Sequence, residues 1–325
     1  MPAYLPPRNA LLSRYTSKKL DGSEHLELLC ERKRSDYVQQ QSVECHFAGS
    51  DSWVILSPIE QSIKRKIEAV GTPLKDWDIQ INYGIKTGYN DAFIINTEKR
   101  NEILSNCQTE EERTRTAELI RPILRGRDIK RYGYNWANLW LINTHNGIRG
   151  KLERVHIEDY PAIKAHLDQY WDRISKRADK GDTPYNLRNC AYLEDFSKPK
   201  ILWKRVGSIL RFCYNDNEAL GLDSTCFAIG NNIEFVCCVL NTPMGHYLLK
   251  DAPKTGTGDL LISVQAVEPL KMPSVSHELN KEFKRLLEIM STNSSNDIEN
   301  EISQKIFNLY GLSCEEQRYI DENFT

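Results

Sequence analysis

The chain has 325 residues and a formal net charge of −2, since 43 Lys and Arg stand against 45 Asp and Glu. This balance excludes a histone-like basic protein but leaves room for a local basic face. Its hydrophobic content of 40% is that of an ordinary globular protein, and it has no run of the roughly 20 apolar residues that a membrane helix needs. The nine cysteines are scattered without a CxxC pair, so the sequence predicts a reduced, cytoplasmic protein with no disulfide framework, zinc site or membrane partner.

The first clear element in chain order is a helix that begins at Pro58. Ser57 is a good N-cap, Pro58 suits the first helical position, and Glu60 completes a capping box. A one-sided apolar pattern follows, and Gly71 ends the helix. Before this helix, "HLELLCERK" and "SVECHF" have the composition of strands.

The middle of the chain alternates between strand and helix patterns. We expect strands at "DAFII", "LWLINT", "KPKILWKRV", "LRFCYN" and "STCFAIG". We expect one helix from the cap Thr109 to about Leu124, one over "DYPAIKAHLDQYWDRISKR" with Trp171 inward, and a buried one at "IEFVCCVLNTPMGHYLL". From Ser276 onward two amphipathic helices and a short helix capped by Ser313 follow. The fold class is therefore α+β, a mixed and mostly antiparallel core with packed helices and a helical tail.

A glycine-rich stretch, "NYGIKTGYNDAFII" at 82–95, resembles a phosphate-binding loop at first sight. A Walker loop requires GxxxxGK[ST] and a dinucleotide fingerprint requires GxGxxG, and neither spacing is present. A tight turn between strands, made possible by Gly84 and Gly88, is the simpler interpretation.

No catalytic signature stands out in the chain. Asp21, Glu31 and Lys33 fit a metal-dependent nuclease motif only by a match that chance supplies in any charged sequence. The Asn-Pro-Pro-aromatic motif of adenine methyl transfer is absent, and so is GxSxG. We therefore assign this chain no catalytic and no metal-binding residue.

Two basic stretches are interleaved with aromatic residues. They are "RPILRGRDIKRY" at 121–132, with Asp128 as its one acid, and "KPKILWKRVGSILR" at 198–211, with none. This pattern fits contacts to DNA phosphates. A solvated face fits the spacing equally well.

Several stretches taken together resemble one family. They are "WVILSPIEQSIKRKIEAVGTPLKDWDIQINYGIKTGYNDAFII", "LIRPILRGRDIKRYGY", "WLINTHNG", "DYPAIKAHL", "KPKILWKRV" and "LDSTCFAIG". In this order they resemble the TaqI-like C-terminal specificity domain, the target-recognition domain of adenine-specific DNA methyltransferases and of Type IIG restriction-modification enzymes. The resemblance covers about residues 47 to 273.

The resemblance implies three parts: an N-terminal segment (1–46) leading from a missing upstream domain, a DNA target-recognition domain (47–273) and a helical tail (274–325). It implies sequence-specific binding of double-stranded DNA, with a covalently linked or associated methyltransferase domain, and sometimes an endonuclease. S-adenosylmethionine, and magnesium where an endonuclease is present, would belong to those domains and not to this chain. The candidate DNA-binding residues are Lys86, Thr87, Tyr89, Asn90, Arg125, Arg127, Lys130, Arg131, Lys204 and Arg205.

Two other interpretations remain open. One is a phage-defence methyltransferase that uses the same domain without a fused nuclease. The other is a protein-interaction module whose helical tail docks on partner subunits and whose basic patches are incidental.

Overall fold

The computed structural model describes residues 10–13, 42–45, 56–293 and 295–324. The chain divides into two units, Met1–Lys66 and Ile67–Thr325. In the first unit, β1 (Ala10–Ser13) and β2 (Ser42–Cys45) pair antiparallel. Strand β2 confirms part of the strand expected at "SVECHF", whereas "HLELLCERK" and the nuclease-like match at 21–33 lie outside the described residues.

Helix α3 (Pro58–Val70) begins where its capping box predicts. The backbone N–H of Ser57 donates to Glu60 Oε2 over 2.9 Å, and the N–H of Glu60 donates to Ser57 Oγ over 3.4 Å. The boundary between the two units falls within this helix.

A four-stranded antiparallel sheet forms the centre of the second unit. Its order is β10-β8-β12-β4, and its inner strands β8 and β12 are almost entirely buried. Leu202 and Phe227 stand opposite each other on these strands and belong to one hydrophobic cluster with Phe196. These four strands are β4 (Ile79–Tyr83), β8 (Lys200–Lys204), β10 (Phe212–Asn215) and β12 (Thr225–Gly230).

A second four-stranded sheet has the order β11-β6-β7-β5. It is antiparallel except for the parallel pair of β11 and β6. Its strands are β5 (Ile94–Asn96), β6 (Ile120–Leu124), β7 (Leu139–Ile142) and β11 (Leu220–Gly221). Two short pairs complete the strands: β3 (Gly71–Pro73) with β14 (Lys271–Pro273), and β9 (Val206–Gly207) with β13 (Leu260–Leu261).

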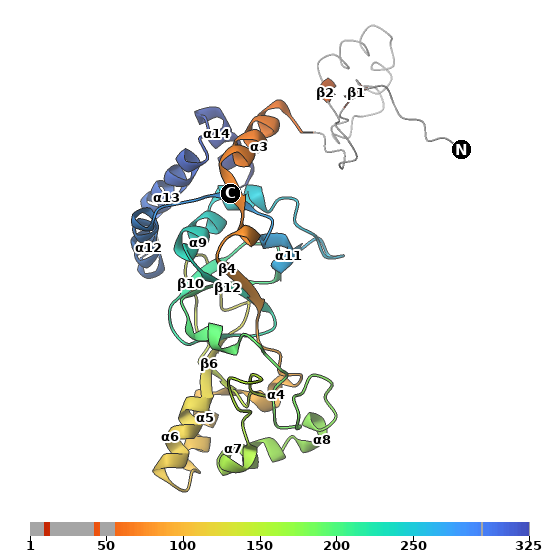
Figure 1. Ribbon diagram of the computed structural model, residues 1–325, viewed down its shortest axis with the longest axis vertical. Helices are drawn as coiled ribbons and strands as arrows, with labels where there is room; N and C mark the ends of the chain where they lie inside the picture. Colours follow the sequence, from red (N-terminus) through yellow and green to blue (C-terminus); the bar gives the residue numbers. More distant parts are fainter. Residues whose placement is uncertain (1–9, 14–41, 46–55, 294, 325) are drawn as a thin grey trace, which may run out of the picture. The chain divides into compact units, whose positions relative to one another are not determined.

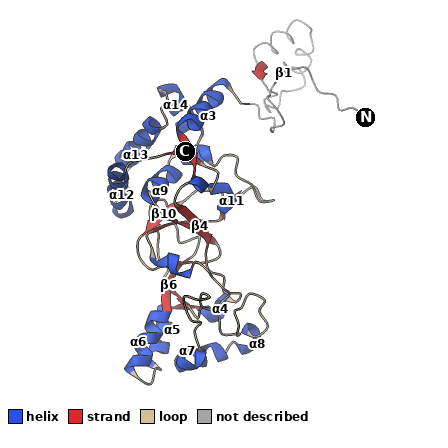
Figure 2. Ribbon diagram, viewed as in Figure 1, coloured by secondary structure: helices blue, strands red, loops and turns tan. Residues whose placement is uncertain are grey.

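The helices of the second unit form two groups with the strands between them (Figure 2). One group lies near the second sheet: α4 (Asn90–Phe93), α5 (Thr97–Ser105), α6 (Glu110–Leu119), α7 (Pro161–Asp168) and α8 (Trp171–Ile174). The other lies across the central sheet (Figure 1): α9 (Ile233–Asn241), α10 (Pro243–Leu248), α11 (Val264–Val267), α12 (His277–Thr292), α13 (Asn296–Leu309) and α14 (Cys314–Asn323).

The expected α+β class, with a mostly antiparallel core and a helical C-terminal segment, is confirmed. Helices α12 and α13 pack on each other and on α9, while α14 packs on α10. The capping box of α14 is present as expected, with Ser313 and Glu316 bonding each other's backbone N–H.

Several expected boundaries are wrong, for local reasons. The "DAFII" strand is limited to Ile94–Asn96, because one helical turn (α4) precedes it. Helix α6 ends at Leu119, because Pro122 lies in strand β6 and cannot continue a helix. The long helix expected from Asp159 breaks into α7 and α8, and Trp171 is 44% exposed instead of inward. The buried helix breaks before Pro243 into α9 and α10.

Candidate nucleic-acid interface

The glycine-rich stretch leaves the central sheet at the end of β4 and passes directly against the backbone before β12. Gly84 N donates to Thr225 O over 3.0 Å, and Ile85 N donates to Gly221 O over 2.7 Å. A Cβ on Gly84 would stand 1.9 Å from the carbonyl oxygen of Leu222. Since no real Cβ approaches an oxygen so closely, residue 84 must be glycine for these two segments to touch.

Gly88 meets a second segment in the same way. Its φ is +72°, in the left-handed region, and a Cβ there would stand 2.5 Å from Asp179 O. The stretch is therefore a tight connection that depends on glycine at two positions. Gly84 allows two segments to approach closely, and Gly88 allows both a close approach and a left-handed backbone conformation.

Arg177 fastens this connection from inside the protein. Its Nη1 donates to the carbonyl oxygens of Thr87 and Asp179, and its Nη2 donates to those of Pro184 and Asn186. Its guanidinium also lies 4.4 Å from the centre of the Phe93 ring. The side chain is only 7% exposed, and burial lowers its pKa to about 10. It therefore stays charged at neutral pH and holds the segments 87–88 and 179–186 together.

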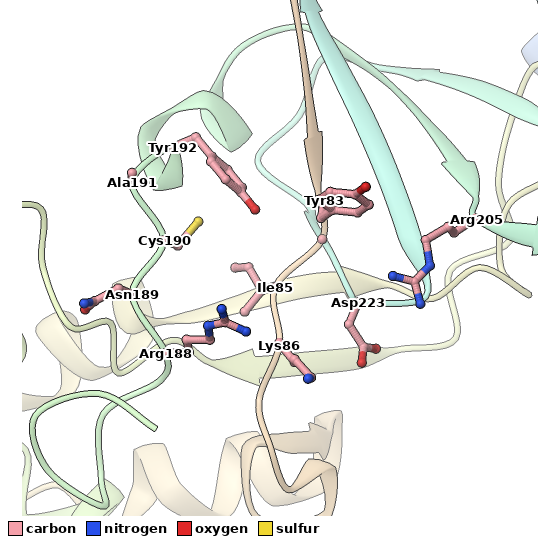
Figure 3. A pocket seen from close by; sticks show the side chains of 11 residues that line it. Tyr83, Ile85, Lys86, Arg188, Asn189, Cys190, Ala191, Tyr192, Arg205 and Asp223 are labelled. Atoms are coloured by element: carbon pink, nitrogen blue, oxygen red, sulfur yellow. The ribbon is translucent and has the colours of Figure 1, made fainter. Parts of the chain in front are cut away.

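An open groove lies beside this fastened loop. One part, of about 530 Å³, is lined by the loop at Tyr83–Lys86, by residues 188–192, and by Arg205 and Asp223 (Figure 3). A second part, of about 730 Å³, is lined by residues 146–150, Leu152, Arg154, Asp182 and residues 189–191. Both parts are lined by residues 189–191, so they border the same segment, and the name groove refers to the two together.

The groove is positively charged in a chain that is nearly neutral. Five cationic residues line it, against the acids Asp182 and Asp223. The cationic residues are Lys86, Arg149, Arg154, Arg188 and Arg205.

Two of these cations share one carboxylate just outside the groove lining. Lys86 Nζ lies 2.7 Å from Asp179 Oδ2, and Arg188 Nη1 lies 3.3 Å from Asp179 Oδ1. The hydrogen bond from Lys86 holds the pKa of Asp179 below its usual value. The side chains of Lys86 and Arg188 are 48% and 60% exposed. Both therefore remain available to a ligand while Asp179 limits where they can move.

Arg205 is placed differently, at the far side of the first part of the groove. Its Nε is buried and has no hydrogen-bond partner among the described residues. Its backbone N–H donates to Ser224 O over 3.0 Å, and Ser224 Oγ accepts from Gly126 N over 3.1 Å. The two basic stretches noted in the sequence, far apart along the chain, therefore meet at Ser224. The exposed residues Arg127 and Lys204 are the chain neighbours of the two residues that contact Ser224.

Other basic residues singled out in the sequence make internal contacts. Arg125 forms two bonds with Asp128, at 2.9 Å from Nε and 2.8 Å from Nη2. Arg131 Nη2 donates to Asn241 O over 2.5 Å and pairs with Glu299 on α13. These two arginines therefore tie parts of the fold together and do not line the groove.

The remaining candidates of the glycine-rich stretch also lie outside the groove lining. Thr87 is 2% exposed, and its hydroxyl donates to Asn90 Oδ1 over 2.5 Å. Tyr89 packs on Tyr170, with ring centres 6.2 Å apart. Lys130 is half-buried within the first basic stretch. Of the ten candidates, the structure thus brings only Lys86 and Arg205 into the groove.

Lys200 belongs to the second basic stretch but is fully buried. Its Nζ donates to Phe196 O over 2.8 Å and to Asn217 O over 2.5 Å. Burial lowers its pKa to about 8. Its charge is therefore directed at backbone carbonyls of the core and away from any ligand.

Three arginines of the groove were not among the DNA-binding residues predicted from the sequence. Arg149 and Arg154 lie in "NGIRGKLER", where Gly147 and Gly150 both have positive φ and shape a turn. A glycine-flanked arginine is a pattern that could have pointed to Arg149. Arg188 lies in an irregular segment, and nothing in the local sequence distinguishes it.

Within the described part of the chain, no group of three or more His, Cys, Asp or Glu is placed to hold a metal ion. Over the same residues, no helix is long and apolar enough to cross a bilayer.

Solved structures with a similar fold include two restriction-modification enzymes. Type IIL restriction-modification enzyme MmeI, in a complex with DNA, aligns with 78% of this chain at a TM-score of 0.53 and 11% identity, over 36% of its own length. Type IIG restriction endonuclease BpuSI aligns with 81% of this chain at a TM-score of 0.51 and 13% identity, over 31% of its length. No protein-family model and no curated sequence matches the chain. The chain thus spans about a third of the length of these two enzymes and shares the fold of that part of them.

Proposed function

We propose that this chain is a target-recognition domain that binds a specific sequence of duplex DNA within a restriction-modification enzyme. The observation that carries the proposal is the groove with its five cationic residues in a chain of net charge −2. A local concentration of Lys and Arg on one open surface is what a phosphate backbone attracts. The fold shared with parts of MmeI and BpuSI supports the same function.

In this mechanism the cations and the groove floor have separate tasks. Lys86, Arg149 and Arg205 neutralise phosphates and set the register of the protein on the duplex. Polar side chains between them then contact base edges in the major groove, where each base pair presents a distinct pattern of donors and acceptors.

The resemblance to the TaqI-like specificity domain supports an adenine-specific methyltransferase as the catalytic part of the parent enzyme. That part would flip the target adenine out of the duplex to reach its amino group. S-adenosylmethionine would bind there, and magnesium would serve a nuclease if the parent carries one. The present chain would supply recognition and no catalytic group.

The salt dependence of DNA binding tests this proposal. Titrating the chain with labelled duplex DNA at several salt concentrations gives the slope of log K against log salt, to which each phosphate contact contributes about −0.9. Replacing Arg149 or Arg205 by Ala should make the slope shallower by roughly one unit on any duplex. Arg285→Ala is the matched control, because Arg285 is exposed on α12 and outside the groove lining.

If the groove variants and the control all keep the slope of the unmodified chain, the groove does not bind phosphates. The protein-interaction module would then be the better interpretation of the fold.

A further inference from the structure

The two parts of the groove offer different chemistry along the shared segment. Arg188 lines the first part, and its side chain points toward Ile85 and Lys86 (Figure 3). The next side chain, Asn189, points to the opposite side of the chain (Figure 3), toward the second part. Side chains alternate in this way along extended backbone. A cation thus faces one part of the groove and an amide faces the other.

The orientation of this amide follows from its neighbours. Asn146 Oδ1 accepts from the backbone N–H of Asp182 over 2.8 Å, and Asn146 Nδ2 donates to Asp182 Oδ1 over 3.0 Å. A backbone N–H can only donate, so the oxygen and nitrogen of the Asn146 amide cannot be exchanged. Its Nδ2 also donates to Asn189, which must therefore present Oδ1 to Asn146.

This arrangement leaves a defined hydrogen-bonding group exposed in the groove. The oxygen of Asn189 is occupied by Asn146, while its Nδ2 has no hydrogen-bond partner among the described residues. An amide nitrogen carries two N–H donors and no acceptor. Asn189 therefore offers donors on an exposed side chain that Asn146 and Asp182 hold in place.

We propose that Asn189 is a specificity-determining residue that donates to the major-groove edge of one guanine in the recognised DNA. Guanine presents two acceptors there, N7 and O6, whereas cytosine presents a donor. The usual pair between an amide and adenine also requires the amide oxygen to accept from adenine N6, whereas this oxygen is turned toward Asn146, from which it already accepts a hydrogen bond.

The surroundings of Asn189 match this role. Arg149 and Arg154 line the same part of the groove, with Arg154 Nη1 3.5 Å from Asp182 Oδ2, and in this proposal they contact the flanking phosphates. Leu152, 37% exposed in the same wall, offers an apolar contact of the kind that base edges accept. Asn146 acts as a positioning residue, because it fixes which end of the Asn189 amide faces outward.

The inference rests on the proposed function, and its test begins with that function. The unmodified chain is used to select its preferred duplex from a random library. Each guanine of the selected site is then replaced in turn by 7-deazaguanine, which lacks the N7 acceptor but still pairs with cytosine. Affinities are measured for the unmodified chain, for Asn189→Ala and for Asn101→Ala. Asn101 is an exposed amide on α5 outside the groove lining and serves as the control.

At one guanine, the 7-deaza change should weaken binding by the unmodified chain about 10-fold, the lower range for loss of a good base contact. Asn189→Ala should show a similar loss on the intact site, no further loss with 7-deazaguanine at that position, and an unchanged salt slope. Asn101→Ala should keep the full sensitivity at every guanine.

The possible failures are distinguishable. If the unmodified chain binds no duplex DNA or selects no sequence, the proposed function fails and this inference fails with it. If the chain selects a site but Asn189→Ala keeps the same affinity and the same 7-deazaguanine sensitivity at every position, the function stands and the role of Asn189 is refuted. A selected site in which no guanine responds to the 7-deaza change refutes the role of Asn189 as well.

Discussion

Replacing Arg177 by Met should destabilise the second unit strongly. Arg177 donates to four backbone carbonyls and stacks on Phe93, with only 7% of its side chain exposed. Methionine keeps an apolar stem of similar length, so the substitution removes mainly the charged donors. The four backbone carbonyls that accept from Arg177 would then be left without these hydrogen bonds.

The expected cost follows from the hydrogen bonds that are lost. Bonds from a charged group contribute about 1.5–3 kcal/mol each, but part of that gain is offset by the cost of burying the guanidinium. That cost is visible in the direction of the shift, since burial lowers the pKa of Arg177 to about 10. We therefore expect a net loss of about 3–5 kcal/mol in the free energy of unfolding. For a unit of this size that corresponds to a fall of about 10 °C in Tm.

Thermal unfolding followed by circular dichroism measures this loss. Arg177→Lys keeps the charge, but a single ammonium group cannot reach four carbonyls as the planar guanidinium does, so an intermediate Tm is expected. Arg173→Met is the control, because Arg173 is exposed on α8. A Tm for Arg177→Met equal to that of Arg173→Met would refute the view that Arg177 fastens the glycine-rich stretch.

Two further substitutions test the contact of Gly88 with Asp179 and the burial of Lys200. Gly88→Ala should cost about 2 kcal/mol or more in urea unfolding, because left-handed backbone costs a non-glycine residue about 1–2 kcal/mol and the new Cβ would also press on Asp179 O. Gly150→Ala has a similar φ of +75° but nothing within 4 Å of its Cβ, so it should show the backbone cost alone, and equal losses would contradict the contact. Lys200 has a folded pKa of about 8 against an ordinary 10.5. Below about pH 8 Lys200 is charged in both the folded and the unfolded state, so the folded state bears the full cost of burying the charge. As the pH rises from the folded pKa toward the unfolded pKa, the folded state loses its proton first and that cost disappears. The stability of the unmodified chain relative to Lys200→Met should therefore rise by up to about 3 kcal/mol between about pH 7 and pH 10. A difference that stays constant over this range would show that Lys200 keeps an ordinary pKa.

Local signals in the sequence predicted those helices and strands that are stabilised by residues close by in the sequence. The capping boxes at Ser57 and Ser313 are each complete within four residues, so the starts of α3 and α14 were visible in the sequence. Three strands of the central sheet, β8, β10 and β12, were equally visible, because their apolar, β-branched and aromatic runs are continuous. Together these elements were enough for the α+β class.

The ends of helices and strands were harder to predict where strand pairing in the folded protein overrides the local sequence pattern. Thr109 caps α6 as expected, but the residues after Leu119 pair with β7 and β11 instead of extending the helix. The apolar pattern of 120–124 suits either a buried helix or a buried strand, and periodicity alone does not separate these over so short a run.

The candidate site depended still more on the tertiary structure. A positive charge in the sequence does not reveal its partner. The partner of Arg125 is three residues away, whereas Glu299, the partner of Arg131, is 168 residues distant, and Lys200 is directed at backbone carbonyls. The sequence by itself showed two basic stretches and predicted a tight turn made possible by glycine near Lys86. Only the fold decided which cations share a groove, because Lys86, Arg149 and Arg188 come from separate loops. Loops are brought together by the packing of the sheets beneath them, and no local pattern records that packing.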